Sequence, residues 1–99
     1  MKIAFMYVAK DADPKKHRVI VPSPEQLEMT VIAVKDFDQA VETAKTLVQD
    51  GIKIIELCGG FGYLATSRVK SAVGSRAEVG VVRFDKHPGL NGKSGDEVF

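Results

Sequence analysis

Apolar and polar positions alternate along the chain in a way that predicts four short strands. Residues 3–9 form a continuous apolar run that ends at a charged turn, and residues 28–35 form a second run rich in β-branched side chains. Apolar runs of this length between turn residues are typical of buried strands. By the same criteria, residues 52–57 and 78–84 are predicted to be strands.

The segment between the first two strands, residues 10–27, is the least regular part of the pattern. Its prolines interrupt any helix, because proline has no N–H to donate to the preceding turn. Arg18–Val21 is a candidate for a short edge strand that Pro22 ends. Pro24 is placed to open one helical turn that ends at Leu27.

One helix is strongly predicted after Asp36, whose side chain is a favoured N-cap. Gln39 three residues later completes a pattern that resembles a capping box. Gly51 follows the last turn, where a helix commonly ends in a left-handed residue. One apolar stripe with helical spacing runs along it, formed by Phe37, Ala40, Val41, Ala44, Leu47 and Val48.

A second helix is predicted from the glycine-rich turn at residues 58–62 to about Val73, with Gly74 at its end. The element order is therefore β-β-α-β-α-β. Strands that alternate with helices favour parallel pairing through right-handed crossovers. The sequence predicts a single α/β domain over residues 1–99, with a small, mostly parallel sheet of about four strands and two main helices. Residues 85–99 are predicted to be an ordered loop or a lid.

The predicted strands are apolar on both faces, as residues 3–9 and 52–57 illustrate. Two helices can cover only one face well. The other face is covered either by a second copy of the chain or by residues 10–27 together with the tail. The first alternative predicts a homo-oligomer, with a dimer favoured.

Composition narrows the class of protein further. The 99 residues are 44% hydrophobic and 27% charged with a net charge of +1, which indicates one compact soluble domain and excludes a disordered chain. The near-neutral charge argues against nucleic-acid binding. A single cysteine excludes an internal disulfide, and the apolar start is too short for a membrane span or a secretion signal. The expected location is the cytoplasm.

Candidate chemistry lies where the third and fourth strands end. Ligands of open parallel sheets bind beyond the carboxyl ends of the strands. The backbone amides of Gly59, Gly60 and Gly62, at a helix N-terminus, could hold a phosphate or carboxylate together with Arg83. The alternatives are a tight turn for the glycines and an ion pair for Arg83, with Asp85 or Glu56 as its partner.

Three residues at the same edge are candidates for catalysis. Cys58 precedes the helix N-terminus, which favours a nucleophilic thiolate, and Asp85 with His87 has the spacing of an acid–base pair. The alternatives are a buried space-filling cysteine and a simple loop turn. No metal-ligand spacing is present and no cofactor is indicated. The basic cluster Lys15–Arg18 is either a solvated loop or a surface that steers an anionic ligand.

The runs Ile55–Gly62 and Val79–Leu90, which contain the CGGFG and VGVVRFDxHPGL motifs, resemble a family of short single-domain prokaryotic proteins of unknown function. The resemblance covers nearly the whole chain but implies no activity. Two functional hypotheses follow from the residues themselves. One is binding of an anionic small molecule at the sheet edge, with or without catalysis by Cys58 or Asp85 and His87. The other is a non-catalytic oligomeric module with a structural or ligand-sensing role.

Overall fold

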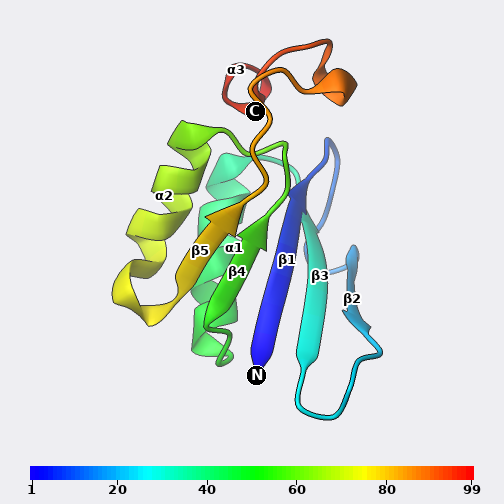
Figure 1. Cartoon of the computed structure of the whole chain (residues 1–99), viewed down its shortest axis with the longest axis vertical. Helices are drawn as coiled ribbons and strands as arrows, with labels where there is room; N and C mark the ends of the chain where they lie inside the picture. The colour runs from blue at the N-terminus through cyan, green and yellow to red at the C-terminus, as the bar shows by residue number, and fades with distance from the viewer.

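Five strands form one mixed sheet in the order β2-β3-β1-β4-β5, and two helices pack against one of its faces (Figure 1). The computed structural model describes residues 1–99. The strands and main helices are β1 (Lys2–Val8), β2 (Arg18–Val21), β3 (Glu28–Val34), α1 (Phe37–Gln49), β4 (Ile54–Leu57), α2 (Tyr63–Val73) and β5 (Glu78–Val81). Only β2 is antiparallel to its neighbour. The predicted α/β class with a mostly parallel sheet is confirmed.

The sheet differs from the prediction in its strand count and in some strand ends. Arg18–Val21 is a true fifth strand at the edge of the sheet. The strand predicted at 78–84 ends at Val81, because β4 ends at Leu57 and offers its last carbonyl to the N–H of Val82. The helical turn predicted at Pro24 is a simple turn closed by one hydrogen bond from the N–H of Leu27.

Helix α1 follows its predicted signals closely. The Asp36 side chain accepts a hydrogen bond from the N–H of Gln39 (2.8 Å), and the Gln39 side chain accepts one from the N–H of Lys35 (2.8 Å). Gly51 has a φ of +91°, the left-handed conformation expected after a helix. The apolar stripe faces the sheet, with Phe37, Ala40, Ala44 and Leu47 buried.

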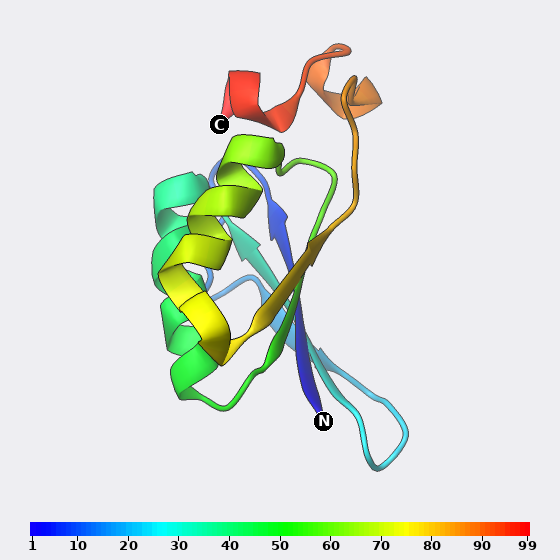
Figure 2. The ribbon, with the colours of Figure 1, turned by 60° about the vertical axis from the view of Figure 1, so that its left-hand side comes forward.

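The strand order explains why both helices lie on the same face. The connection from β3 through α1 to β4 passes over β1, and the connection from β4 through α2 to β5 continues in the same direction. Right-handed crossovers that advance in one direction place their helices on one side of the sheet. Figure 2 shows α1 and α2 side by side on that side. The hydrophobic core lies between them and the sheet, and includes Met6, Ile32, Val34, Ile55, Leu57, Phe61, Val69 and Val73.

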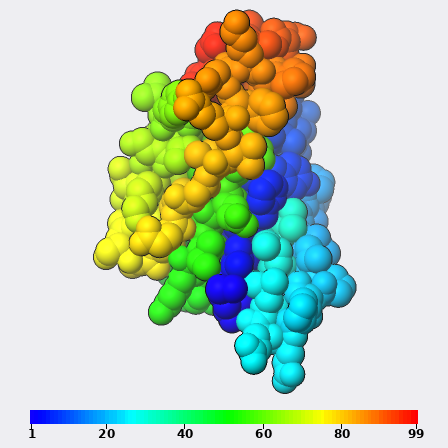
Figure 3. Space-filling view, in the orientation of Figure 1, coloured from blue at the N-terminus to red at the C-terminus, as the bar shows by residue number.

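The opposite face of the sheet, which Figure 3 shows, has no helix over it. It carries mostly apolar side chains. The strand register places them in two rows across the sheet. One row is Val21, Met29, Ile3, Ile54 and Glu78, and the next is Val19, Val31, Phe5, Glu56 and Gly80. We call these two rows, together with Tyr7, the open face. Residues 18–21 extend the sheet instead of covering it, and the tail lies across the strand ends, so neither of them covers this face.

The tail, predicted as a loop or lid, contains a 3₁₀ turn, η2 (Pro88–Leu90), and a short helix, α3 (Gly95–Val98). It lies across the carboxyl ends of the strands, at the top of Figures 1 and 2. Ser94 and Glu97 form a capping box at the start of α3. The ring of Phe99 lies 5.9 Å from that of Phe37, so the end of the tail joins the core. None of the helices has the length and apolarity that crossing a membrane requires.

Candidate functional site

The predicted site residues meet at one edge of the sheet. Strands β4 and β5 are parallel neighbours, so the turn at residues 58–62 and the segment at residues 83–87 leave the sheet on the same side. A small cavity of about 20 Å³ lies there, lined by residues of both segments. It is lined by Gly62, Arg83 and Asp85 but not by Cys58 or His87. This volume admits a single water-sized probe and no metabolite.

Arg83, Asp85 and Tyr63 form the polar cluster of this edge. The Arg83 guanidinium donates two hydrogen bonds to the Asp85 carboxylate, each 3.1 Å, and the Tyr63 hydroxyl donates a third at 2.8 Å. The guanidinium carbon of Arg83 also lies 5.3 Å from the centre of the Tyr63 ring. Of the two ion-pair partners considered for Arg83, the structure has Asp85. The carboxylate therefore takes up two of the Arg83 N–H donors that were expected to hold an external anion.

These contacts shift all three pKa values. The hydrogen bonds from Arg83, and then from Tyr63, lower the pKa of Asp85. The bond to Asp85 raises the pKa of Arg83 and that of Tyr63. All three groups are exposed to solvent, which weakens each interaction. The cluster stays in one charge state through the neutral range, with Asp85 ionised, Arg83 charged and Tyr63 neutral.

Asp85 and His87 do not form the acid–base pair that their spacing suggested. The His87 Nδ1 atom accepts a hydrogen bond from the N–H of Gly89 (3.0 Å), which caps η2. Its ring lies 4.8 Å from the ring of Phe84. The imidazole thus orders the tail, while the Asp85 carboxylate is directed toward Tyr63.

Cys58 lies within the glycine-rich turn and is half-buried. Its Sγ atom accepts a hydrogen bond from the N–H of Gly60 (3.3 Å), and its side chain packs against the core. No contact joins the thiol to Arg83 or His87. These features match the space-filling alternative better than the nucleophilic one.

The N-terminus of α2 already holds an anion, the carboxylate of Asp96 from α3. The N–H groups of Leu64 and Ala65 donate to its two oxygens at 3.0 and 3.2 Å. Such an anion interacts favourably with the helix dipole and with the free N–H groups of the first turn. The anion site predicted at this turn is thus occupied by the chain itself.

The glycines of the turn make room for that contact. A Cβ atom at Gly62 would lie 2.2 Å from the Asp96 carboxyl group, and one at Gly95 would lie 1.7 Å from the carbonyl oxygen of Gly60. A Cβ atom at Gly59 would meet the Phe84 ring at 2.2 Å. Close packing against Phe84 and the tail leaves no room for a side chain at these three glycines.

Sequence reasoning missed Asp96. Its contact spans 32 residues, and no local pattern marks a partner that far away. The capping box of Ser94 and Glu97 was visible in the sequence and would have indicated the short helix that carries it.

Nothing in the described residues assembles a metal centre, because no three His, Cys, Asp or Glu side chains converge. No match was found among curated proteins or among solved structures. A family model does match residues 1–97, that of a family of unknown function, DUF6506. With almost its whole length matched, the chain belongs to the DUF6506 family.

Proposed function

We propose that this protein is a non-catalytic module that acts as a symmetric dimer, in which two copies pack their open faces together. The proposal rests on one observation, the two apolar rows on the uncovered side of the sheet. Val19 on this face is 56% exposed and Val21 is 38% exposed. Such side chains are stabilised when they are removed from water.

Sheet architecture supports a covered face. All-parallel sheets occur almost only with both faces covered, and in this mixed sheet four of the five strands are parallel. Strands β1 and β3 have seven residues each, and β2 and β4 have four each, which at standard spacings gives these four neighbours a face of roughly 350 Å². The largest apolar patch of a typical monomer is about this size and is often functional. The patch would supply the apolar centre of an interface of about 800 Å² per partner, with a polar rim around it.

The charge distribution favours a second copy of the chain as the partner that covers the open face. No charged side chain stands in the two rows where they cross β2, β3 and β1. Glu56 and Glu78 lie to one side, on β4 and β5. A neutral centre meets its own copy without repulsion, and an isologous two-fold contact is the commonest arrangement of oligomers. If the two copies are shifted relative to each other so that Glu56 and Glu78 lie at the rim of the interface, no unpaired carboxylate is buried.

The contacts at the carboxyl edge of the sheet support the non-catalytic reading over catalysis there. Asp96 uses the N–H groups of α2, Asp85 uses the guanidinium of Arg83, and His87 caps η2. An external anion would have to displace one of these internal partners. We therefore favour assembly over chemistry at this edge.

Sedimentation equilibrium at micromolar concentration tests the proposal with two matched variants. The parent protein is expected at twice the 10.8 kDa mass of one chain. Val19→Glu places a charge on the open face and is expected to give the monomer. Leu64→Glu, at a residue that is 72% exposed on α2, is expected to leave the dimer intact. A monomeric parent, or a dimer that Leu64→Glu breaks and Val19→Glu does not, would overturn the proposal.

A further inference from the structure

A groove lies on the helix side of the sheet, between β2 and α1. Helices α1 and α2 follow the crossovers toward β4 and β5, so the helix-facing side of β2 has no helix over it (Figure 2). Two hollows line up in this gap. One of about 370 Å³ lies beside the C-terminal half of α1, and one of about 270 Å³ lies beside its N-terminal half. Arg18 lines both of them.

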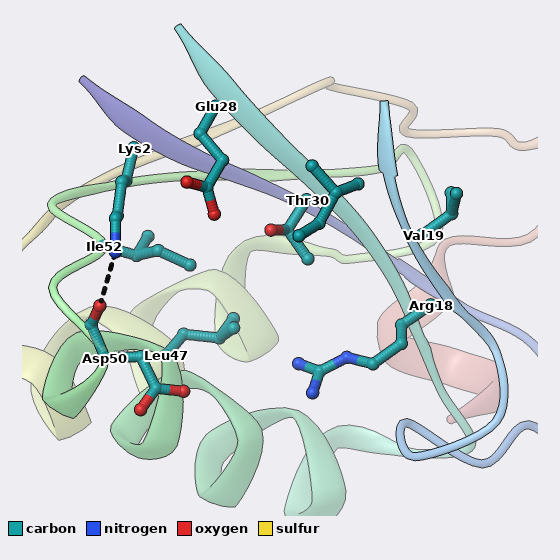
Figure 4. A pocket seen from close by; sticks show the side chains of 9 residues that line it. Lys2, Arg18, Val19, Glu28, Thr30, Leu47, Asp50 and Ile52 are labelled. Carbon is teal, nitrogen blue, oxygen red and sulfur yellow. Dashed lines mark hydrogen bonds between the residues drawn. The ribbon is translucent and has the colours of Figure 1, made fainter. Parts of the chain in front are cut away.

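The guanidinium of Arg18 has no protein partner. It extends from β2 into the groove toward Leu47 of α1 (Figure 4). The other three arginines are engaged: Arg68 with Asp38, Arg76 with backbone carbonyls, and Arg83 with Asp85. Arg18 belongs to the basic cluster that the sequence singled out, and its five N–H donors remain free for an anion in the groove.

Two threonine hydroxyls open into the same groove. Thr30 and Thr43 are each only 8% exposed, and neither hydroxyl is hydrogen-bonded to another protein group. No buried side-chain oxygen lacks a partner, so both hydroxyls must be reachable from solvent. Thr30 lines the larger hollow and Thr43 lines the smaller one. Both hydroxyls therefore reach solvent within the groove. A ligand near Arg18 would therefore meet further hydrogen-bonding groups.

The charged groups around the groove define what kind of anion it accepts. Near Arg18, Lys15 adds positive charge, while Glu42 is paired with Lys45 at 3.4 Å. At the far end of the larger hollow, Glu28 and Asp50 supply carboxylates, and Lys2 lies beside them with its ammonium donating to the backbone carbonyl of Asp50 at 3.4 Å (Figure 4). Two carboxylates against one ammonium leave this end of the groove with a net negative charge, which repels a second negative charge on the ligand and favours a monoanion over a phosphate.

The wall between the two charged ends is apolar. Ile20, Leu47 and Ile52 line the larger hollow between Arg18 and the acidic end. A short aliphatic chain that covers them would be removed from water. The volume of about 370 Å³ lies at the lower end of the range for small-molecule sites.

We propose that this groove binds a small monocarboxylate with a short aliphatic chain. The carboxylate pairs with the Arg18 guanidinium, and the chain lies on Ile20 and Leu47. The groove faces the helices and the open face lies on the other side of the sheet, so binding goes beyond the proposed dimer and does not depend on it.

Titration of ¹⁵N-labelled protein with hexanoate, followed by two-dimensional NMR, tests the proposal. Saturable shifts are expected at residues 18–20, at Thr30 and along residues 43–47. Hexan-1-ol has a matched chain and no charge, and acetate keeps the carboxylate without the chain. Each is expected to bind at least about tenfold more weakly than hexanoate, because one lacks the carboxylate and the other lacks the aliphatic chain.

Two arginine variants provide the matched control. Arg18→Gln is expected to raise the Kd for hexanoate about tenfold or more, the loss typical of a charge-assisted hydrogen bond. Arg83→Gln, at the guanidinium already paired with Asp85, is expected to leave the Kd within about twofold. Hexanoate that does not shift the groove residues, that binds Arg18→Gln as well as the parent, or that binds no better than hexan-1-ol would overturn the proposal. The mass of the protein in solution does not enter this test, so it can fail while the dimer stands.

Discussion

The side chain of Asp96 caps helix α2 by accepting a hydrogen bond from the backbone N–H of Leu64, 32 residues earlier in the chain. This contact ties the last helix of the molecule to the first turn of a core helix. The tail is therefore part of the fold. The same contact explains why the glycine-rich turn has no side chain at Gly62.

Replacing Asp96 should destabilise the protein measurably. Asp96→Ala is expected to lower the free energy of unfolding by about 1–2 kcal/mol, because two N–H groups lose their acceptor and the helix dipole loses a charge. Urea denaturation measures this change. Glu25→Ala is the control, since its exposed side chain makes no hydrogen bond or ion pair. An Asp96→Ala protein as stable as the control would show that the cap contributes nothing.

Gly62 and Asp96 should be energetically coupled. Gly62→Ala alone brings a Cβ atom to 2.2 Å from the Asp96 carboxyl group and is expected to destabilise the fold. In the Asp96→Ala background that carboxyl group is gone, so the same substitution should cost less by about 0.5 kcal/mol or more. Gly80→Ala, where a Cβ atom meets nothing within 4 Å, is the matched control. Additive effects of Gly62→Ala and Asp96→Ala would contradict this coupling.

The local patterns of the sequence predicted the main elements well. The cap at Asp36, the stripe along α1 and the left-handed glycine after it are all determined within a few residues, and all three were found. The parallel pairing of β4 and β5 also followed from their connection through a helix. The shared edge for residues 58–62 and 83–87 came directly from that pairing.

Contacts between distant segments could not be predicted in the same way. Asp85 was equally free, by sequence, to orient His87 or to pair with Arg83. The Tyr63 hydroxyl, which donates a hydrogen bond to the Asp85 carboxylate at 2.8 Å and so helps to fix its orientation, is 22 residues away. The strand order could not be predicted from the sequence either, although it is this order that places both helices on one side and leaves the other face of the sheet uncovered. The role of Arg18 depends on a gap between β2 and α1 that exists only once the sheet is assembled.

The polar cluster at the sheet edge gives a pH dependence with a defined sign. The pKa of Asp85 is lowered from its usual 3.8, chiefly by Arg83 and then by Tyr63, as an NMR titration should show. Arg83→Gln is expected to raise that pKa more than Tyr63→Phe does. The stability that ionised Asp85 contributes should be constant between about pH 5 and pH 9 and be lost as the pH falls below about 4. If the stability difference between parent and Asp85→Asn instead grew as the pH fell, the assigned contacts would be wrong.

Tyr63 provides the alkaline counterpart of that experiment. Its pKa is raised above 10.0 because the neutral hydroxyl donates to Asp85, so its contribution to stability is lost only as the pH rises past that value. Tyrosinate absorbance in a Tyr7→Phe background isolates this group. Asp85→Asn should return the Tyr63 midpoint toward 10.0. A Tyr63 midpoint that Asp85→Asn leaves unchanged would show that the hydrogen bond to Asp85 does not raise this pKa.

The packing of two open faces is tested most directly by intermolecular NMR contacts. A sample that mixes isotope-labelled and unlabelled chains, examined by a filtered NOE experiment, reports only contacts between different copies. Packing of the two open faces predicts intermolecular contacts among the side chains of Ile3, Phe5 and Val31, at the centre of the open face. Intermolecular contacts confined to α2 or to the outer edge of β5, or none at all at micromolar to millimolar concentration, would contradict it.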